Sequence, residues 1–556
     1  MANKKLFRSN SKTSKKVQEA TVFNNAGGWA YEMSPRHALA QIASTNTFNG
    51  TFYASGEANL ELAKNAALQL KNDALFVAKA AIYSRTKNYM KDMPAFLMVV
   101  LAGMDTELFR KVFPQVIDNG KMLRNFIQIA RSGVTGRTFN MSSGACRHAI
   151  RDWFVTRSAD QIFRASVGND PSMRDILRMG HPRPENDSKA ALYAYLDGYD
   201  IDMKKGILYT LDKNGEVRHS HKFSKLPAIV RNYELYKRNR EGNVPKVDFR
   251  MLDSLNLSDD EWVEIARNAG WTMTRMNLNT FARHKVFANK EVTKLIVDRL
   301  VNPEEIKQSK VFPYQLMAAY NSTENGNIPF EVRDALQEAM EIAVDNVPKI
   351  NGKVYICVDT SGSMDSPITG YRTGSTTAVN CVDVAALFAA SVLRKNPSAE
   401  VLPFDTQVRH VSVNGRDSIM TNAKKLALRG GGTDCSCALK HLNHKGAKGD
   451  LVVFVSDNES WVDTVNMSYA RSTGLMNEWV SFQKRNPKAK LVCIDLTPRN
   501  NAQVNENKDI LLIGGWSDSV YNVVAQFVEG NNSQDSWVAE IEKVDINKGL
   551  NTDNDE

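Results

Sequence analysis

The sequence predicts a protein of the α plus α/β class, with a helical-repeat domain followed by a doubly wound α/β domain. Three observations support this prediction. The chain has 556 residues, too many for one hydrophobic core. Amphipathic helical patterns follow one another over about 280 residues with short breaks between them. From residue 353 onward, apolar strand patterns alternate with helical ones, as in a parallel sheet.

The helical patterns begin at Glu57, after an aromatic-rich stretch over 29–55 that has no helical period. Apolar residues then recur at i, i+3 and i+4, and breakers such as Pro94, Pro114 and Gly120 separate the segments. Short helices joined by short turns predict a HEAT-like α-solenoid of helical pairs, although no crisp repeat motif appears. The patterns expected to be helical here cover residues 57–68, 73–84, 93–101, 106–116, 121–131 and 258–343.

Residues 190–247 interrupt this pattern with tyrosines interspersed among lysines and arginines. The segment Lys213-Asn214-Gly215-Glu216 predicts a hairpin turn, so we expect an irregular insertion and not another helical pair. Interleaved basic and aromatic residues can stack on RNA and neutralise it, but they equally suit an exposed loop. Both interpretations stay open.

The sequence of the second domain predicts a regular alternation of strands and helices. Expected strands cover 353–358, 400–404 (continuing as a hairpin to 413), 451–456, 490–495 and 510–514, and expected helices cover 381–394, 421–428, 435–443, 475–485 and 518–528. We therefore predict four segments: a basic disordered arm over 1–20, a helical domain over 21–350, an α/β domain over 351–535 and a flexible acidic tail over 536–556.

Charge is divided unevenly between the two domains. Residues 1–350 hold 50 lysines and arginines against 38 aspartates and glutamates, and residues 351–556 hold 21 against 24. The potential to bind a polyanion therefore lies on the first part of the chain. The excess within the first 150 residues, 20 against 9, suggests nucleic acid as the polyanion.

Cysteine usage and hydropathy indicate the compartment. The six cysteines are scattered, and Cys435-Ser436-Cys437 has the wrong spacing for a zinc site, so buried reduced thiols are expected. No run of 18 apolar residues predicts a membrane span. We expect a monomer in a reducing cytoplasm, with no membrane partner.

A candidate metal site follows the first strand of the second domain. Asp359, Ser361 and Ser363 form an Asp-x-Ser-x-Ser pattern that places one carboxylate and two hydroxyls on one tight turn. Downstream, Thr433 ends a triple-glycine loop, and Asp457 ends another strand pattern. Because open α/β sheets bind ligands at the carboxyl ends of their strands, the three loops are expected to converge on one Mg²⁺-sized cation.

Each part of this pattern also has a structural explanation, because a strand-end aspartate is commonly a turn residue and a glycine run is commonly a flexible turn. The order of residues resembles the metal-ion-dependent adhesion site of von Willebrand factor A domains. The resemblance implies that Ser361, Ser363 and Thr433 contact the cation directly and that Asp359 and Asp457 act largely through water. A haloacid-dehalogenase phosphotransferase would need a second acid where this chain has Ser361. A purely structural ion is the competing interpretation.

Two arginine clusters are candidate RNA-binding sites in the helical domain. Arg137, Arg147 and Arg151 surround a helix start that is rich in small residues, where backbone N–H groups and guanidinium groups can both meet phosphates. A second cluster lies beside a Gly-Pro break and consists of Arg174, Arg178, His181 and Arg183. For any one of these arginines, a solvated helix face is the alternative.

The segments around these clusters resemble the TROVE module of the Ro autoantigen family and its bacterial Ro-related members, and the metal domain follows in the order that this family shows. The resemblance covers roughly residues 20–535. The motifs that carry it are Arg-x-x-Ile-x-Asp-Trp-Phe at 147–154, Asp-Ile-Leu-Arg-Met-Gly-His-Pro-Arg-Pro at 175–184, Met-Asn-Leu at 276–278 and Phe-Pro-Tyr-Gln-Leu-Met-Ala-Ala-Tyr at 312–320.

This resemblance implies a ring of helical repeats that holds single-stranded 3′ ends of misfolded RNA in its hole and a Y RNA on its outer surface. It also implies a 3′-to-5′ exoribonuclease such as polynucleotide phosphorylase, tethered through RNA. His181 and Arg164 match the family's RNA-contacting positions, whereas a further basic position of the family is Gly168 here.

The leading hypothesis is a non-catalytic RNA-binding protein with a divalent cation, Mg²⁺ or another, in its second domain. The alternative is a metal-dependent adhesion or chaperone-like module in which the helices are only scaffold. A Mg²⁺-dependent nuclease is disfavoured, because two-metal hydrolysis needs several carboxylates and this site is mostly hydroxyls.

Overall fold

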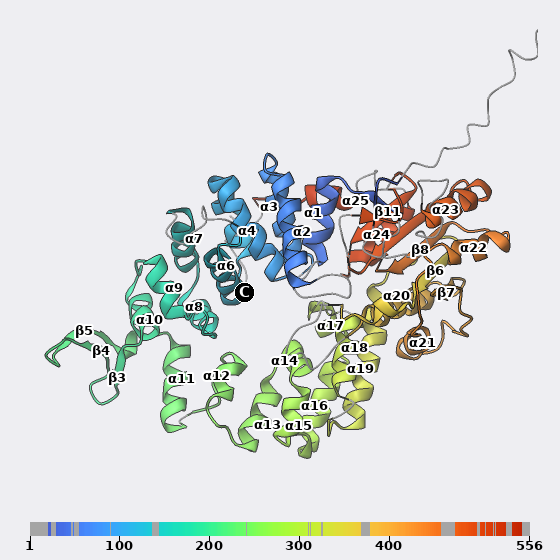
Figure 1. Cartoon of the computed structure of the whole chain (residues 1–556). Coiled ribbons are helices and arrows are strands. Elements are labelled where there is room, and N and C mark those ends of the chain that lie inside the picture. The colour runs from blue at the N-terminus through green and yellow to red at the C-terminus, as the bar shows by residue number, and fades with distance from the viewer. Residues whose placement is uncertain are drawn as a thin grey trace, which may run out of the picture. The chain divides into compact units, whose positions relative to one another are not determined.

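The computed structural model contains two compact units. It describes residues 20–23, 29–45, 48, 55–88, 90–135, 144–240, 242–309, 311, 313–323, 326–368, 379–457, 473–497, 501–505, 507–514, 516, 519–529 and 536–547. The sheet unit comprises Met1–Leu62 and Val344–Ala539, and the helical unit comprises Ala63–Ala343 and Glu540–Glu556. Figure 1 labels the elements of both units.

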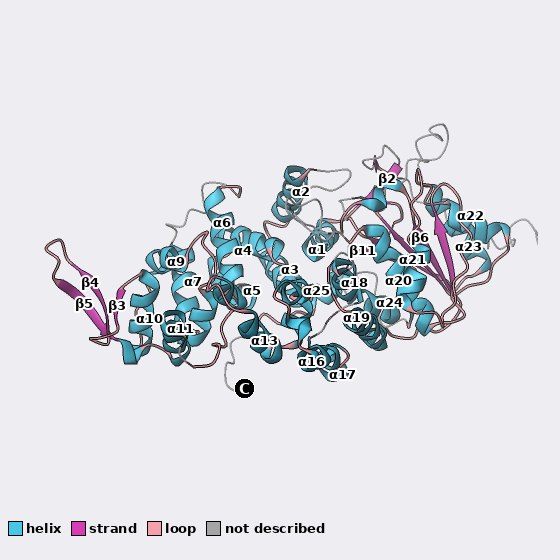
Figure 2. Cartoon of the chain, turned by 90° about the horizontal axis from the view of Figure 1, so that it is seen from below, coloured by secondary structure: helices cyan, strands magenta, loops and turns pink. Residues whose placement is uncertain are grey.

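The helical unit is the expected succession of short helices, and helices dominate it in Figure 2. The first of these helices, α2, begins in the sheet unit and ends in the helical unit. Closure of the helices into a ring stays a prediction. The helices are α2 (Gly56–Gln69), α3 (Ala74–Thr86), α4 (Asp92–Met104), α5 (Thr106–Val116), α6 (Gly120–Ser132), α7 (Gly144–Val155), α8 (Ala159–Ala165), α9 (Met173–Gly180), α10 (Asp187–Asp197), α11 (Ala228–Asn239), α12 (Phe249–Asp253), α13 (Asp259–Asn268), α14 (Trp271–Met276), α15 (Leu278–Arg283), α16 (Lys290–Leu300), α17 (Pro303–Ser309), α18 (Pro313–Ser322) and α19 (Phe330–Ala343).

Helix α6 shows why these segments are helical. The side chain of Asn119 accepts hydrogen bonds from the N–H groups of Lys121 and Met122, both at 3.0 Å, and so caps the first turn. Gly133 ends the helix in the left-handed conformation with φ 70°. One face, which includes Phe126, is buried against α4. Capping and burial of an apolar stripe therefore agree, as the periodicity predicted.

The segment expected to be an irregular insertion contains a regular sheet. Strands β3 (Asp200–Asp202), β4 (Ile207–Leu211) and β5 (Val217–Lys222) pair antiparallel in that order, between α10 and α11 (Figure 1). The hairpin turn is confirmed: Asp212 N–H donates to the Glu216 carbonyl at 2.8 Å, and Gly215 adopts φ +81°. The description as irregular was wrong, because sheet pairing depends on cross-strand partners that the local pattern does not reveal.

The sheet unit holds a parallel five-stranded sheet in the order β11-β9-β8-β6-β7. This confirms the predicted doubly wound domain, although the expected hairpin to residue 413 is reduced to one bridge between Phe404 and Val408. The elements are β6 (Val354–Asp359), α20 (Cys381–Lys395), β7 (Glu400–Phe404), α21 (Ile419–Leu426), α22 (Cys437–His444), β8 (Leu451–Ser456), α23 (Gly474–Arg485), β9 (Lys490–Asp495), β10 (Asn501–Ala502), β11 (Ile510–Gly514) and α24 (Ser519–Val528).

The N-terminal segment that was expected to open the helical domain belongs to the sheet unit. Strand β1 (Val22–Phe23) pairs with β2 (Trp29–Glu32), and β2 pairs antiparallel with β10. A helix, α1 (Pro35–Thr45), lies in the stretch that showed no helical period and packs on β11. The side chain of Tyr31 joins the apolar core beside the parallel sheet. Its partners lie more than 300 residues further along the chain, so local sequence could not predict this packing.

The expected flexible tail is also partly ordered. Helix α25 (Ser536–Glu542) buries Ile541 completely, Lys79 Nζ donates to the Glu542 carbonyl, and Gln115 Nε2 donates to the Ile546 carbonyl at 2.8 Å. The apolar side chain of Ile541 outweighs the acidic composition of the segment that contains it. The remainder of the tail from 548 and the basic arm over 1–19 lie outside the described residues.

Two further expectations have structural outcomes. All six cysteines are free and buried, as predicted. In the part of the chain that the structure describes, no helix has the length and apolar character needed to cross a bilayer.

A substitution of Gly514 tests the packing of α1 on β11. A Cβ atom at this position would lie 2.4 Å from Cβ of Gln41 and 2.9 Å from its Cα. We expect Gly514→Ala to push α1 away and to lower the free energy of unfolding by about 1–3 kcal/mol. Guanidinium-induced unfolding followed by circular dichroism measures this change. Gly270→Ala is the control, because no atom lies within 4 Å of its added Cβ; equal effects in both variants would contradict the packing argument.

Candidate functional sites

The predicted metal-binding residues all lie at one end of the parallel sheet. Asp359 ends β6, Asp457 follows β8, and β6 lies between β7 and β8 in the sheet. In chain order, β7 follows β6 and lies on one side of it, and β8 comes next and lies on the other side. The loops after β6 and β8 therefore lie at the topological switch point, where such sheets bind ligands. All five predicted residues are buried, at no more than 4% exposure: Asp359, Ser361, Ser363, Thr433 and Asp457.

The turn after β6 brings the predicted oxygen atoms together. Asp359 Oδ1 accepts a hydrogen bond from Ser361 N–H at 2.8 Å, and Ser456 Oγ donates to Asp359 Oδ2 at 2.6 Å. The hydroxyls of Ser361 and Ser363 are 3.2 Å apart. The Asp-x-Ser-x-Ser pattern therefore forms one compact cluster of a carboxylate and two hydroxyls.

The glycine-rich loop is joined to this turn by its backbone. Gly362 N–H donates to the Gly431 carbonyl at 2.9 Å, and Gly430 N–H donates to the Thr360 carbonyl at 2.7 Å. A Cβ atom on Gly430 would lie 2.5 Å from Asp405 Oδ2, so only glycine allows the loop to approach this closely. Thr433 is carried on the same loop.

Several buried carboxyl groups share this end of the sheet. Burial raises the pKa of Asp359, the neighbouring Asp405 adds to the rise, and hydrogen bonds from Ser456 and Ser361 oppose it. Burial also raises the pKa of the Cys381 thiol, and the negative charges of Asp457, Asp495 and Asp359 raise it further. These acids therefore lie around Cys381, at the start of α20. Crowded carboxylates that are removed from water favour a bound cation.

Asp405 is a member of this cluster that the motif search missed. Burial by itself would raise its pKa, but hydrogen bonds from the Arg409 guanidinium, at 3.1 and 2.5 Å, and from Gln407 N–H hold the pKa below its ordinary value. Asp405 directly follows β7, at the edge of the sheet where Asp359 lies. That position after a predicted strand was the feature of the sequence that could have indicated it.

The donor set fits a hard divalent cation. Among the described residues, no group of three or more His, Cys, Asp or Glu side chains could hold a metal ion. A cation at this edge would therefore depend on hydroxyl oxygens together with one or two carboxylates. Such oxygen ligands suit Mg²⁺.

The predicted RNA-binding residues gather on α7, α8 and α9 of the helical unit, except Arg137, which lies outside the described residues. Arg147, Arg164 and Arg183 are exposed. Arg151 is half-buried, and its Nε donates to the Gly180 carbonyl at 3.4 Å. Arg174 and Arg178 both form ion pairs with Asp197, at 3.3 and 3.0 Å. His181 is exposed at the end of α9.

Arg164 borders a cationic cavity of about 370 Å³, which we call the Arg164 groove. Its two aspartates are already paired, Asp118 with Arg85 at 2.7 Å and Asp248 with Arg250 at 3.1 Å. The basic residues lining the groove are Lys121, Arg124, Arg157, Arg164 and Arg250. The groove therefore carries an excess of positive charge.

The buried Arg124 is a cation that sequence reasoning missed. Its guanidinium donates to the carbonyls of Gly120 and Ala165, both at 3.0 Å, and of Pro171 at 3.1 Å. Burial lowers its pKa, and the charge of Arg250 adds to the effect. Gly168, where the resembling family has a basic residue, has φ +122°, and its added Cβ would lie 2.9 Å from Arg124 Nε. A cation therefore lies beside this glycine, supplied by another helix.

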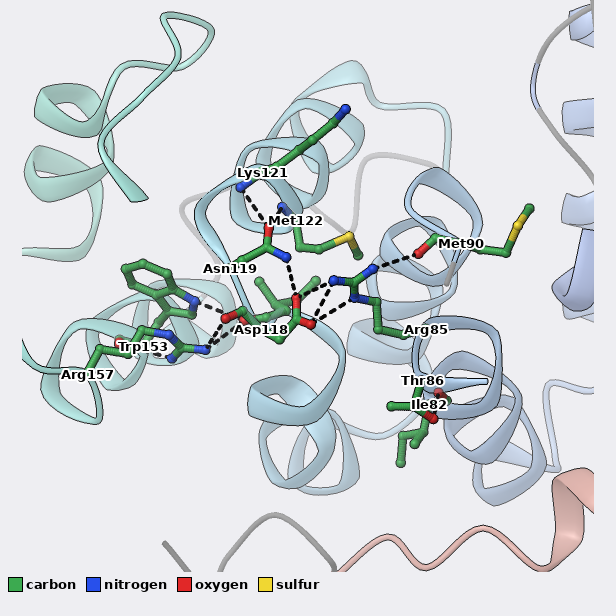
Figure 3. Close-up of polar contacts among 11 residues, drawn as sticks. Ile82, Arg85, Thr86, Met90, Asp118, Asn119, Lys121, Met122, Trp153 and Arg157 are labelled. Carbon is green, nitrogen blue, oxygen red and sulfur yellow. Dashed lines mark hydrogen bonds and ion pairs between the residues drawn. The ribbon is translucent and has the colours of Figure 1, made fainter. Parts of the chain in front are cut away.

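Figure 3 shows why Arg157, at the margin of the groove, is a structural residue. Its guanidinium stacks on the Trp153 ring at 4.3 Å and donates to the carbonyls of Ile117 at 3.1 Å and Asp118 at 3.2 Å. Trp153 Nε1 donates to the same Ile117 carbonyl at 2.9 Å. Burial lowers the pKa of Arg157 to about 10. These contacts fasten α7 to the end of α5.

The Gly180-His181 pair explains how His181 is presented. A Cβ atom on Gly180 would lie 2.8 Å from Cγ2 of the buried Ile150, so glycine lets α9 pack closely on α7. His181 then caps α9 in the left-handed conformation, with φ 45°, and its N–H donates to the Leu177 carbonyl at 2.8 Å. The cap turns the imidazole out of the helix into solvent.

Comparisons with known proteins agree with this architecture. A family model described as the Ro60 vWA domain matches residues 353–528. A protein of Deinococcus radiodurans named RNA-binding protein RO60 is 23% identical over 549 residues, covering 94% of this chain and 98% of that protein. A protein of the same name from Caenorhabditis elegans is 20% identical over 615 aligned positions, covering 93% and 91%.

A solved structure is also similar to this chain. The crystal structure of the Deinococcus radiodurans RO (RSR) protein superposes with a TM-score of 0.59 at 18% identity. The match covers 90% of this chain and all of the other. It shows a shared fold.

The Gly180 contact yields a stability prediction. We expect Gly180→Ala to lower the free energy of unfolding by about 1–3 kcal/mol, because its Cβ overlaps a branched methyl group in a packed interface. Gly144→Ala on α7 is the control, since its Cβ meets nothing closer than 4.0 Å. Chemical denaturation of both variants checks this. A Gly180→Ala variant as stable as the wild type would show that α7 and α9 do not need the close approach.

Proposed function

We propose that this chain, which is similar to Ro proteins over nearly its whole length, is a non-catalytic RNA-binding protein whose helical unit holds RNA. One observation carries this proposal: the Arg164 groove is lined by five basic side chains, while both of its aspartates already have arginine partners. RNA phosphates neutralise such a groove and release counterions on binding. The names of the Deinococcus and Caenorhabditis relatives, RNA-binding protein RO60, support the same ligand.

Further exposed basic residues lie on α7 and at the end of α9. Arg147 and Arg183 are accessible, and His181 is turned outward. Arg174 and Arg178 share one carboxylate, that of Asp197, so a net positive charge remains at this end as well. Exposed guanidinium and imidazole groups suit the backbone and the unpaired bases of folded RNA.

More specifically, we propose a small ribonucleoprotein with a role in RNA quality control. The partners would be a Y RNA, single-stranded 3′ ends of misfolded noncoding RNA and an exoribonuclease such as polynucleotide phosphorylase tethered through RNA. The support for these partners is the family resemblance of residues 147–154 and 175–184, which lie on and beside the cationic helices.

We also propose that the cluster at the end of β6 and β8 binds a divalent cation such as Mg²⁺. Ser361, Ser363 and Thr433 would supply hydroxyl oxygens, and Asp359 and Asp457 would hold the cation's charge. A bound cation would offset the repulsion among these buried acids and offer a Lewis-acidic position to a carboxylate. A protein-binding adhesion function is the second candidate, because such a carboxylate would come from a partner protein.

Charge reversal on α8 and removal of the imidazole after α9 test the RNA proposal. We expect Arg164→Glu combined with His181→Ser to weaken RNA binding about tenfold or more and to lower the slope of log affinity against log salt by about 1 or 2. Both side chains are exposed, so the melting temperature should not change. Gel-shift titrations of a structured RNA with a free single-stranded end, at several salt concentrations, measure the effect.

The matched control is Lys488→Glu, an exposed lysine of the sheet unit whose reversal changes the net charge equally. It should bind RNA nearly as the wild type does. Equal losses in the control and the double variant would indicate a general charge effect, and unchanged affinity in the double variant would contradict the assignment of Arg164 and His181.

Thermal unfolding with Mg²⁺ or with chelator tests the cation proposal. A cation that binds only the folded state at a hundredfold excess over its dissociation constant stabilises by about 2.7 kcal/mol. We expect MgCl₂ to raise the melting temperature of the wild type relative to EDTA, and Ser361→Ala or Thr433→Ala to lose most of that rise.

Ser391→Ala is the control for this measurement. Ser391 is a fully buried hydroxyl of α20 that donates to the Leu387 carbonyl at 2.8 Å. This variant should keep the Mg²⁺-dependent rise even where its overall stability falls. A wild type that melts identically in MgCl₂ and EDTA would refute the cation site.

A further inference from the structure

The inserted sheet β3-β4-β5 helps to build a second cavity in the helical unit. This cavity has a volume of about 330 Å³ and lies between the end of α9, helix α10 and strand β5, so we call it the α9-β5 pocket. Its wall includes four side chains with a phenol or imidazole ring: His181, Tyr193, Tyr199 and His221. Pro182 and Arg178 also line the pocket.

The rings of this pocket are held by contacts behind them. The Tyr193 ring packs edge-on against the buried Phe154, with centroids 5.8 Å apart and planes at 82°. The rings of Tyr199 and His221 lie 6.0 Å apart at 52°. His221 is paired across the sheet with the fully buried Leu208, which fixes the position of its backbone. The pocket wall is therefore largely pre-formed.

Two guanidinium groups lie at the α9 side of the pocket. Arg174 and Arg178 both contact Asp197 Oδ1, each through its Nε atom, so one carboxylate serves two guanidinium groups. Strand β5, Val217–Lys222, contains Arg218 and Lys222 and no acidic residue, and both side chains are exposed. A phosphate that flanks a ligand in the pocket would meet the guanidinium groups of α9.

We propose that the α9-β5 pocket holds one unpaired nucleobase of a bound RNA, stacked against His221 and Tyr199, with Arg178 facing a flanking phosphate. This inference rests on the proposed RNA-binding function and adds the inserted sheet to the RNA-binding surface. A base in a duplex has both faces covered by its neighbours, so only a bulged or single-stranded base can enter a ring-lined pocket. The inserted sheet would then favour RNA molecules that expose an unpaired base.

Two RNA hairpins that differ by one nucleobase test the proposal on the full-length chain. The first carries a single bulged adenosine, and the second carries an abasic nucleotide at the same bulge, so backbone and charge are identical. Because stacking of one base on an aromatic side chain strengthens binding by roughly tenfold, we expect the wild type to bind the first hairpin about tenfold more tightly. Fluorescence anisotropy with labelled hairpins measures both affinities.

Substitutions on β5 connect this preference to the pocket. His221→Ala should reduce the preference to about one, and His221→Phe should keep it, because phenylalanine retains a stacking ring. His219→Ala is the matched control: it removes an exposed imidazole from the same strand, and His219 does not line the pocket. This variant should behave as the wild type does.

Each outcome bears on a different statement. A wild type that binds neither hairpin would overturn the proposed RNA function itself. A wild type that binds both hairpins equally, or a His221→Ala variant that keeps the preference, would overturn the pocket and leave RNA binding intact. If circular dichroism shows that His221→Ala is unfolded, Tyr199→Leu, which replaces a ring by an apolar side chain, provides the same test.

Discussion

The helical unit depends on arginines that donate hydrogen bonds to main-chain carbonyls near the ends of neighbouring helices. Burial lowers the pKa of all four arginines concerned. A main-chain carbonyl attracts a cation through its partial negative charge without cancelling the cation's full charge. The helices are thus linked and remain basic. The pairs are Arg124 with Ala165 and Pro171, Arg157 with Ile117, Arg275 with Gln315, and Arg299 with Ala266 and Arg267.

The sheet unit shows the opposite electrostatic arrangement. Its buried polar residues at the carboxyl edge are acids and hydroxyls, with Asp359 and Asp405 both inaccessible to solvent. Burial raises the pKa of Asp359 and of Asp383, so bringing these carboxyl groups together costs free energy that a cation would offset. The unequal charge of the two parts of the sequence therefore has a structural basis: the helical unit keeps its buried arginines charged, and the sheet unit gathers acids and hydroxyls at one edge of its sheet.

Much of the candidate metal site could be predicted to cluster, because its residues are close in sequence or follow strands with strong apolar patterns. Asp359, Ser361 and Ser363 fall within five residues, so a tight turn at this point brings their side chains together. Thr433 and Asp457 were placed by the rule that parallel strands end at the same edge. Asp405 was not found, because a single aspartate after a strand resembles any turn residue until Arg409 and Gly430 are seen around it.

The proposed RNA-binding surface was less predictable. Arg164 and His181 were selected by resemblance, whereas Arg124 lies within the helical pattern of α6 and was not singled out. Arg157 is fixed on Trp153. His221 lies on a strand whose pairing could not be inferred from the hairpin turn alone. In each of these residues the function of the side chain depends on a neighbour from another helix or strand.

By itself, the sequence determined most helices of the first part, the alternation of strands and helices in the second, their order, and the residues of the Asp-Ser-Ser turn. It could do so because helical and strand periodicity, caps and turns are set by residues within a few positions of one another. Only the tertiary structure decided that residues 20–45 complete the sheet unit, that Arg124 lies beside Gly168, and that β5 closes a pocket on α9. These features arise from packing and pairing between distant segments, where the free energy depends on shape and charge complementarity that no local pattern encodes.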